Sequence, residues 1–371
     1  MKLDVIELTK TLVSIPSVSR MSNAPVADAV KSLFAGSDWE VEESAYVDPN
    51  GERKVNLVAK LGQGTGGLAF CSHNDTVPGQ EQDWPAFTPE IRDGKLYGRG
   101  SCDMKGPLAA TLVAALSIEP ASLKKPIYIV ATSDEEISLL GAKFLSETSE
   151  ILRRDRPEYG IIAEPSRMMP VYSHKGFCTI QVKSLGRAAH SSTGLGESAL
   201  LKAIPFLSYL VDLDKMLQED ESFMNSLYNP PHHTLNLTVN SGEAALNVMA
   251  PQTMIEISVR GMPDSRTDEL VDMIIEKARS YGLEAQGRCT NVLFTPISSE
   301  IVQVCIELTG LDPETVTYGT DGSYLMDVIE QLVILGPGDI ALAHTVGEYV
   351  PVDELHQAVD VYKRLIEKLC Q

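Results

Sequence analysis

Residues 107–132 read PLAATLVAALSIEPASLKKPIYIVAT, and this stretch decides the fold. The segment 107–116 is almost entirely apolar, which predicts a buried helix. The segment 126–132 is a continuous apolar run without polar alternation, which is typical of a strand covered on both faces. A buried helix followed closely by such a strand predicts a sheet with helices packed against it.

Similar runs recur outside this stretch, so the pattern describes a whole domain. Helical spacing of apolar residues predicts terminal helices at 3–14 and 352–370. Strands that alternate with helices predict an α/β fold with a mostly parallel, doubly wound sheet. In such sheets, ligands bind beyond the carboxyl ends of the strands. Further strands are predicted at 56–61, 68–71, 160–163 and 332–335.

The pattern changes in the middle of the chain, between residues 176 and 290. Polar and apolar residues alternate there in three segments, as in strands with one solvated face. Together with two helical segments and a last strand, they give the order βαββαβ of a ferredoxin-like domain. We therefore expect a catalytic domain over 1–175 and 291–371, interrupted by a lid domain over 176–290. The alternating strands are 177–184, 234–239 and 253–259, and the helices are about 197–217 and 268–281.

The segment Gly62–Gly67 reads GQGTGG and formally matches the dinucleotide-binding pattern GxGxxG. In a dinucleotide site this pattern follows a strand and opens a helix. Here a predicted strand follows it instead. The segment therefore predicts a turn between two strands, and a nucleotide-dependent dehydrogenase is excluded.

Composition narrows the class of protein. The chain has 371 residues and a formal net charge of -20, which argues against nucleic acid or an anionic membrane as a partner. Its 6 Cys include no CxxC pair, so reduced thiols are expected rather than a disulfide framework. No apolar run approaches the roughly 20 residues of a membrane helix, and the N-terminus lacks the apolar core of a signal peptide. These features predict a cytoplasmic protein.

Five residues of the types that bind metals follow or adjoin the predicted elements: His73, Asp103, Glu136, Glu164 and His344. Each has an ordinary alternative on its own. The histidines could be structural, the aspartate could cap a helix, and the acidic residues could lie in a solvated loop. As a set, however, they suit two divalent metals that share one carboxylate, an arrangement whose usual chemistry is hydrolysis.

Two acids next to these ligands suit supporting roles. Asp75 lies two residues after His73, and in a continuing strand both side chains would point to one face. A carboxylate there could accept the second N–H of a metal-bound imidazole. Glu135 precedes Glu136, and adjacent side chains of an extended chain point in opposite directions. One of the pair could then bind metal while the other moves protons.

Several short motifs carry a resemblance to a known family. They are SHND at 72–75, GRGSCDMKG at 98–106, DEE at 134–136, AEP at 163–165 and AH at 343–344. Over nearly the whole chain the sequence resembles the M20-type binuclear metallopeptidases and deacylases. The resemblance implies two metal ions, Zn²⁺ or alternatively Co²⁺, bridged by Asp103. It implies that His73 and Glu164 complete the first site, that Glu136 and His344 complete the second, and that Glu135 is the general base and then the general acid.

The same resemblance assigns residues of the predicted lid. His190, in the motif AHSS, resembles the family histidine that crosses a dimer interface to stabilise the developing oxyanion, which implies a homodimer formed through the lid. Asn247 and Arg260 resemble residues that bind the substrate carboxylate. Thr320 and Asp321 resemble a further substrate-contacting turn.

The substrate implied is a small N-acyl amino acid, cleaved to a free amine and a carboxylate. The stretches DGKLYG at 93–98, KKPIYI at 124–129 and TLNL at 234–237 resemble acetylornithine deacetylases. The chain departs from that group where Ala163 replaces a usual glycine and where Gly347 replaces a usual acid. N-acetylornithine is therefore the first expectation, another N-acyl or N-succinyl amino acid the second, and a dipeptide or carboxypeptidase substrate the third. A non-catalytic binding protein on the same fold is the alternative from another class.

Overall fold

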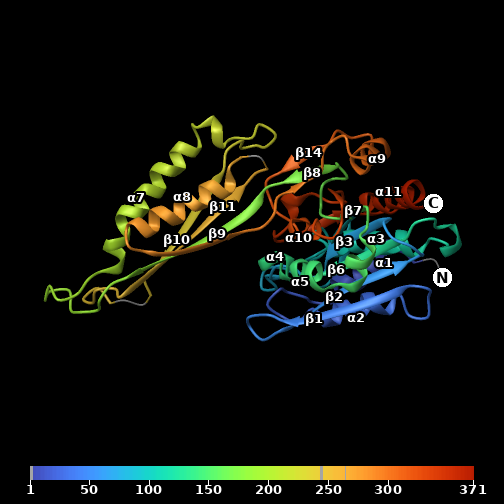
Figure 1. The fold of residues 1–371 in the computed structure, drawn as a ribbon. Helices are drawn as coiled ribbons and strands as arrows, with labels where there is room; N and C mark the ends of the chain where they lie inside the picture. Colours follow the sequence, from blue (N-terminus) through green and yellow to red (C-terminus); the bar gives the residue numbers. More distant parts are fainter. Residues whose placement is uncertain (1–2, 243–244, 264) are drawn as a thin grey trace. The chain divides into compact units, whose positions relative to one another are not determined.

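A computed structural model describes residues 3–242, 245–263 and 265–371 of the chain. The remaining positions of the predicted catalytic domain (1–2) and of the predicted lid (243–244 and 264) lie outside the described residues. The chain forms two compact units (Figure 1). The large unit comprises Met1–Ser173, Leu293–Glu314 and Thr320–Gln371, and the lid unit comprises His174–Val292 and Thr315–Gly319.

The large unit is built on a mixed sheet, which confirms the predicted α/β class. Its parallel part is central and consists of β6, β3, β7 and β15, while the strand pairs outside it with a known register are antiparallel. The sheet runs in the order β1 (Glu40–Val47), β2 (Arg53–Leu61), β6 (Ile127–Thr132), β3 (Leu68–His73), β7 (Tyr159–Ile162), β15 (Gln331–Ile334), β8 (Val171–His174) and β13 (Leu293–Phe294), with β14 (Glu314–Val316) paired to β8.

Both faces of the central strands are buried, as the apolar runs predict. Ile127 and Ile129 of β6 belong to the main hydrophobic core, while Tyr128 and Val130 between them are equally inaccessible on the opposite face. The helices of this unit are α1 (Val5–Val13), α2 (Ala24–Ser32), α3 (Lys105–Leu116), α4 (Glu135–Ser138), α5 (Leu140–Thr148), α6 (Glu150–Asp155), α9 (Glu300–Thr309), α10 (Gly322–Leu325) and α11 (Val352–Cys370).

Helix α3 is the most buried helix of the large unit, and it packs against α1 and α11. Its small residues allow this close approach, because alanine side chains occupy little space between neighbouring backbones. A short sheet of β16 (Tyr349–Pro351), β5 (Lys95–Tyr97) and β4 (Glu90–Arg92) brings the start of α11 next to the loop before α3.

The glycine-rich segment after β2 is a connection between two strands, as predicted. Gly67 has a φ of 82°, and a Cβ at this position would lie 1.9 Å from the carbonyl oxygen of Pro126. Only glycine therefore allows β3 to start alongside β6 here. None of the described helices combines the length and the apolar character that crossing a bilayer requires.

The lid unit has the predicted ferredoxin-like order. Its antiparallel sheet runs β10 (Thr234–Asn240), β11 (Gln252–Gly261), β9 (Gly176–Leu185) and β12 (Glu284–Cys289). Helices α7 (Ala199–Leu217) and α8 (Thr267–Ser280) cover one face, where Ile180, Phe206 and Ile257 belong to a separate hydrophobic core. β10 and β12 are the outer strands of this sheet.

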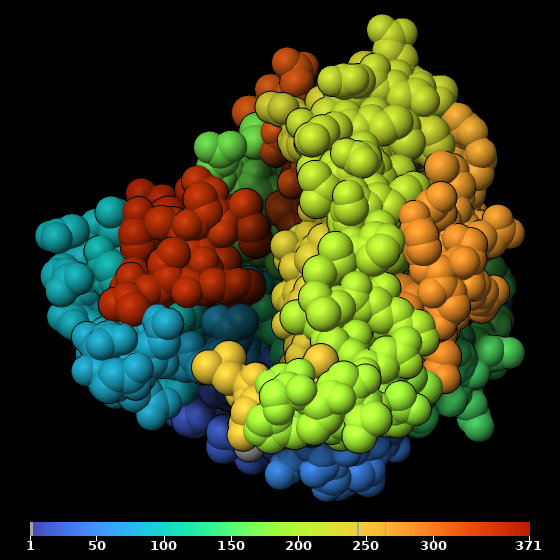
Figure 2. Space-filling view, turned by 90° about the vertical axis from the view of Figure 1, so that its left-hand side faces the viewer, coloured from blue at the N-terminus to red at the C-terminus, as the bar shows by residue number. Residues whose placement is uncertain are grey.

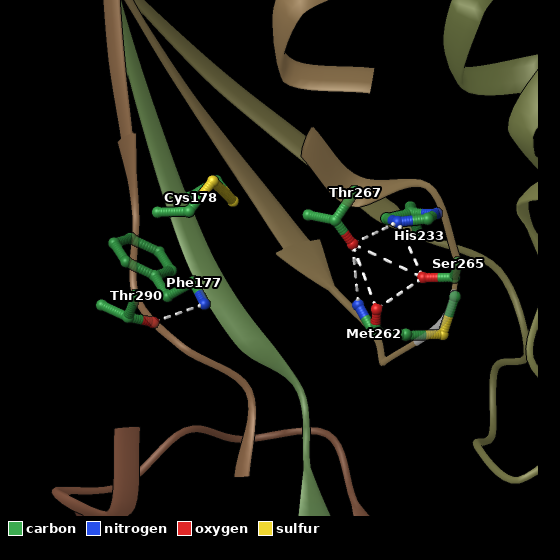
Figure 3. The surroundings of a disulfide bond; sticks show 8 residues. Phe177, Cys178, His233, Met262, Ser265, Thr267 and Thr290 are labelled. Atoms are coloured by element: carbon green, nitrogen blue, oxygen red, sulfur yellow. Dashed lines mark hydrogen bonds between the residues drawn. A yellow bond between two sulfur atoms is a disulfide. The ribbon is translucent and has the colours of Figure 1, made fainter. Parts of the chain in front are cut away.

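The expectation that all cysteines are reduced thiols is wrong for one pair. Cys178 of β9 and Cys289 of β12 form a disulfide (Figure 3). The two residues are direct partners in the antiparallel register, with their Cα atoms 4.0 Å apart. They are separated by 111 positions in the sequence, so spacing alone gave no sign of the pair. The other four cysteines are free and buried.

Candidate metal centre

The first group of ligands forms where two adjacent parallel strands end. Cys71 of β3 pairs with Ile162 of β7, so His73 and Glu164 both lie two residues beyond the same register position. Nε2 of His73 lies 3.0 Å from Oδ1 of Asp103 and 3.5 Å from Oε1 of Glu164. All three residues are buried. The carboxyl ends of the parallel strands thus bring these ligands together, as the sheet topology predicts.

The second group shares Asp103 with the first. Nε2 of His344 lies 3.2 Å from Oδ2 of Asp103 and 2.8 Å from Oε2 of Glu136. Asp103 therefore directs one carboxylate oxygen to each histidine, which is the geometry that a bridging carboxylate needs. The ligand atoms within each group lie within 4.8 Å of one another. These are the five residues that the sequence motifs single out.

Glu135 and Glu136 begin the short helix α4, so the expected extended chain at this position is wrong. Asp134 before them has a φ of 57° and reverses the chain direction. Its carboxylate is bonded to Lys54 at 2.7 Å and to the hydroxyl of Tyr46 at 2.8 Å. Successive helical side chains still diverge. Glu136 accordingly joins the second ligand group, while Glu135 belongs to neither.

Asp75 contacts His73 differently from the expectation. The strand β3 ends at His73, and Nδ1 of His73 lies 3.0 Å from the backbone carbonyl of Asp75 but 3.6 Å from its carboxylate. That carboxylate instead accepts hydrogen bonds from the hydroxyl of Ser19 at 2.7 Å and from the backbone N–H of Glu135 at 3.2 Å. Asp75 thus links the end of β3 to the start of α4.

The electrostatics of the cluster fit divalent cations. Hydrogen bonds to Asp103 and Glu136 raise the pKa of His344 to about 10. Burial and the neighbouring acids raise the pKa of Glu164 and Glu136. The buried acids therefore attract positive charge, and protons on the imidazoles are one way to supply it. Divalent ions would supply that charge instead, and imidazole with carboxylate is a ligand set that zinc commonly takes.

Arg99 and Glu348 form a buried ion pair that the sequence analysis did not find. Nη1 of Arg99 lies 2.6 Å from Oε2 of Glu348, and both side chains are almost inaccessible. Each residue stands four positions from a ligand in the sequence, Arg99 before Asp103 and Glu348 after His344. That equal spacing was the available signal, but it does not show that the two loops meet.

The predicted lid residues fall at opposite ends of the lid sheet. His190 is exposed, and its chain neighbours bond to the segment with Asn247, since the N–H of Ser191 donates to the carbonyl of Asn247 at 2.9 Å. Arg260 lies near the other end of β11, with its guanidinium 4.8 Å from the ring centre of Phe177.

Thr320 and Asp321 are both buried in the large unit. Asp321 accepts a hydrogen bond from the hydroxyl of Thr132, the last residue of β6, and burial raises its pKa to about 7. The N–H of Gly322 donates to the hydroxyl of Thr320 at 3.1 Å. Substrate contacts for these two residues stay a prediction.

Two histidines outside the candidate site, His174 and His233, are fully buried. Nδ1 of His174 lies 2.9 Å from the carbonyl oxygen of Lys175. His233 lies 3.0 Å from the hydroxyl of Thr267 and 3.3 Å from that of Ser265 (Figure 3). His233 therefore joins the β10 end of the lid to the start of α8.

The chain is similar to known proteins over most of its length. Residues 69–368 match the model of peptidase family M20/M25/M40. The chain is 35% identical to an acetylornithine deacetylase from Myxococcus xanthus and 32% identical to one from Pectobacterium carotovorum subsp. carotovorum, covering 97% and 98% of this chain and 96% and 97% of theirs. It also shares its fold with a tripeptidase from Staphylococcus aureus, with a TM-score of 0.74, 23% identity and coverage of 98% of both chains.

Proposed function

Because this chain belongs to peptidase family M20/M25/M40 and is a metal-dependent amide hydrolase, we propose that it removes the acetyl group from N-acetylornithine. The observation that carries the metal chemistry is Asp103, whose two oxygens face His73 and His344 in separate ligand groups. The identity of 35% to an acetylornithine deacetylase over nearly the full chain supports the substrate. The products would be ornithine and acetate.

Five residues would hold the two ions: His73, Asp103 and Glu164 at the first position, and Asp103, Glu136 and His344 at the second. We propose zinc as the native metal and cobalt as a working substitute, since imidazole and carboxylate ligands suit both. When bound, divalent ions would lower the pKa of a coordinated water and polarise the carbonyl of the amide. The remaining steps depend on side chains of the protein.

Glu135 is the proposed proton carrier. It lies beside Glu136 but outside both ligand groups, and its backbone N–H is fixed by Asp75. Burial raises the pKa of its carboxyl group, which favours proton uptake at neutral pH. Glu135 would take a proton from the attacking water and pass it to the nitrogen of the leaving amine. A glutamate whose carboxylate was itself a ligand would be less free to do this.

The lid residues support a site assembled from two copies of the chain. Along β11, Gln252 pairs with Leu185 near the His190 end, whereas Arg260 pairs with Phe177 eight residues away. Eight residues of strand span about 26 Å, far more than the length of an N-acyl amino acid. If His190 and Arg260 contact the same substrate, they therefore come from different lids. Arg260 of one lid would bind the carboxylate in a bidentate pair, assisted by Asn247 of the other lid, while His190, which lies beside that Asn247, would donate a hydrogen bond to the developing oxyanion.

The lid also offers a surface for a second copy. Helix α7 exposes Leu201, Ile204 and Val211, at 63%, 49% and 53% of their areas, on its outer side. Figure 2 shows the segment that includes α7 as the large yellow-green surface facing the viewer. Beside α7, the outer strand β10 has one edge without a strand partner among the described residues. An apolar helix face next to such an edge fits pairing of two lids, so we propose a homodimer.

The substrate proposal is tested with a panel of N-acyl amino acids and dipeptides, assayed with added Zn²⁺ or Co²⁺. N-acetylornithine should give the highest kcat/KM of the panel. A higher kcat/KM for an N-succinyl amino acid or a dipeptide would contradict the proposal while leaving the metal-dependent hydrolysis intact.

A further inference from the structure

Glu348 joins the two loops that carry Asp103 and His344. Its Oε1 accepts three backbone hydrogen bonds from the loop before α3, donated by Gly100 at 2.9 Å, Cys102 at 2.9 Å and Asp103 itself at 3.1 Å. Its backbone carbonyl accepts a further bond from the N–H of Gly98 at 3.0 Å. One buried side chain thus fixes the backbone on which the bridging carboxylate stands.

The ion pair with Arg99 explains how a second carboxylate can lie so near Asp103. Arg99 donates to Oε2 of Glu348 at 2.6 Å and to the carbonyl of Pro78 at 3.2 Å. The guanidinium therefore offsets part of the cost of burying the Glu348 carboxylate. Removing Arg99 would leave this buried carboxylate without its charged partner, so the pair supports the conformation of the loop.

The two ligand groups depend on Glu348 to different degrees. Asp103 belongs to both groups and its backbone N–H donates to Glu348, so a change at Glu348 reaches both positions. Only the second group also contains His344, which lies four residues before Glu348 in the sequence. The side chain of His344 is 53% exposed and Thr345 and Val346 are exposed, so little else in the large unit fixes this segment. In the first group, His73 and Glu164 instead follow the buried strands β3 and β7.

We propose that Glu348 is a positioning residue for the second metal position, because it fixes the Asp103 loop and the His344 loop to each other. The proposal rests on the two-ion site of the proposed function. Glu348 would not touch metal or substrate. Its effect would reach the ion at Glu136 and His344 more strongly than the ion at His73 and Glu164.

The test measures binding of two ions by metal-free protein, titrated with Zn²⁺ or Co²⁺ and followed by calorimetry and cobalt absorption. In Glu348→Gln, the affinity for the second ion should fall about 10–100-fold, the usual effect of losing a residue that orients metal ligands, while the first ion is affected far less. Asp155→Asn is the matched control, since Asp155 is also a buried carboxylate in an ion pair, with Lys60 at 2.6 Å, but lies outside both ligand groups. It should bind both ions as the wild type does.

The proposal is overturned if Glu348→Gln binds both ions like the wild type, if it loses both equally, or if Asp155→Asn shows the same selective loss. Should Glu348→Gln fail to fold, a glycine inserted between Val346 and Gly347 replaces it, because this exposed segment tolerates added length. That insertion should also weaken the second ion alone, and unchanged binding would overturn the proposal. A wild type that takes up one ion would instead refute the two-ion site itself, and this inference with it.

Discussion

The large unit and the lid unit contribute to the proposed reaction in different ways. In the large unit, five candidate ligands from distant parts of the sequence converge in one cluster, with contacts from 2.8 to 3.5 Å. In the lid, His190 is exposed and lies beyond the Gln252 end of β11, whereas Arg260 lies eight strand residues, about 26 Å, from Gln252. The large unit brings all five candidate metal ligands together within one chain. The lid unit of one chain holds its proposed substrate-binding residues far apart.

This difference indicates which step, metal binding or turnover, depends on a second copy of the chain. Ligands at the carboxyl ends of parallel strands are positioned by the fold of a single chain, so metal binding should not require a partner. The lid residues act together only if two lids combine. Dissociating the proposed homodimer should therefore abolish turnover before it abolishes metal binding.

The largest expected effect is the loss of turnover when Glu135, the proposed proton carrier, is replaced. Glu135→Gln removes the group that accepts and returns the proton, and turnover should fall by about 10⁴-fold, because one residue serves two steps. Steady-state assays with metal analysis of the same sample provide the measurement. Metal content should be unchanged, since Glu135 belongs to neither ligand group. A variant with a tenth of the wild-type turnover would refute this role.

The next effect tests whether the lid acts across subunits. His190→Ala should lower kcat by about 10²–10³-fold, the usual cost of losing an oxyanion donor. When His190→Ala and Glu135→Gln chains are mixed, each hybrid dimer contains one site with an intact histidine and an intact general base. Activity should then rise above the sum of the two variants.

Two controls accompany the mixing experiment. Subunit exchange is confirmed with differently tagged chains, because chains that do not mix also show no recovery. Mixing Glu135→Gln with Asp103→Asn serves as a matched control, since both groups stand in the large unit and no hybrid site regains both. No recovery in exchanged His190→Ala hybrids, or a monomer by light scattering at assay concentration, would show that His190 does not act in trans.

The smallest expected effect is on how the free energy of unfolding of the lid depends on pH. Burial lowers the pKa of His233 to about 4, below its ordinary value near 6.5. The unfolded chain therefore binds a proton that the folded chain rejects. The stabilisation is complete above about pH 6.5 and is lost as the pH falls towards 4, by up to about 3 kcal/mol.

Denaturant unfolding at several pH values between 7.5 and 4.5, followed by a signal of the lid unit, gives its free energy of unfolding and so measures this dependence. His233→Gln should flatten the pH slope, although it lowers stability at neutral pH by removing contacts to Thr267 and Phe223. His356→Gln, an exposed change in α11, is the control and should leave the slope unchanged. Equal slopes in His233→Gln and wild type would contradict the account.

Much of the fold could be predicted because its signals are local. The apolar run 126–132 gives β6, and the helical spacing at 352–370 gives α11 with the same bounds. Residues 17–49 have weaker patterns, and α2 and β1 were not predicted there. β1 is an outer strand with no fully buried residue, so its sequence carries little apolar periodicity.

The candidate site divides in the same way. Residue types and motifs single out the five ligands, but contacts between distant loops leave no local pattern. The pairs Arg99–Glu348 and Cys178–Cys289 both join segments more than 100 residues apart, and neither was predicted. The conformation at Glu135 was also missed, because the reversal at Asp134 depends on Lys54 and Tyr46 from other strands.

The most direct test of the account is the number of divalent ions bound per chain. Metal-free wild-type protein reconstituted with excess Zn²⁺ and freed of unbound metal should contain two ions. Asp103→Ala should lose affinity at both positions, because its two oxygens face both ligand groups, whereas Glu164→Ala should affect mainly the first. A wild type that saturates at one ion per chain, or an Asp103→Ala variant that still binds two, would contradict the bridged site.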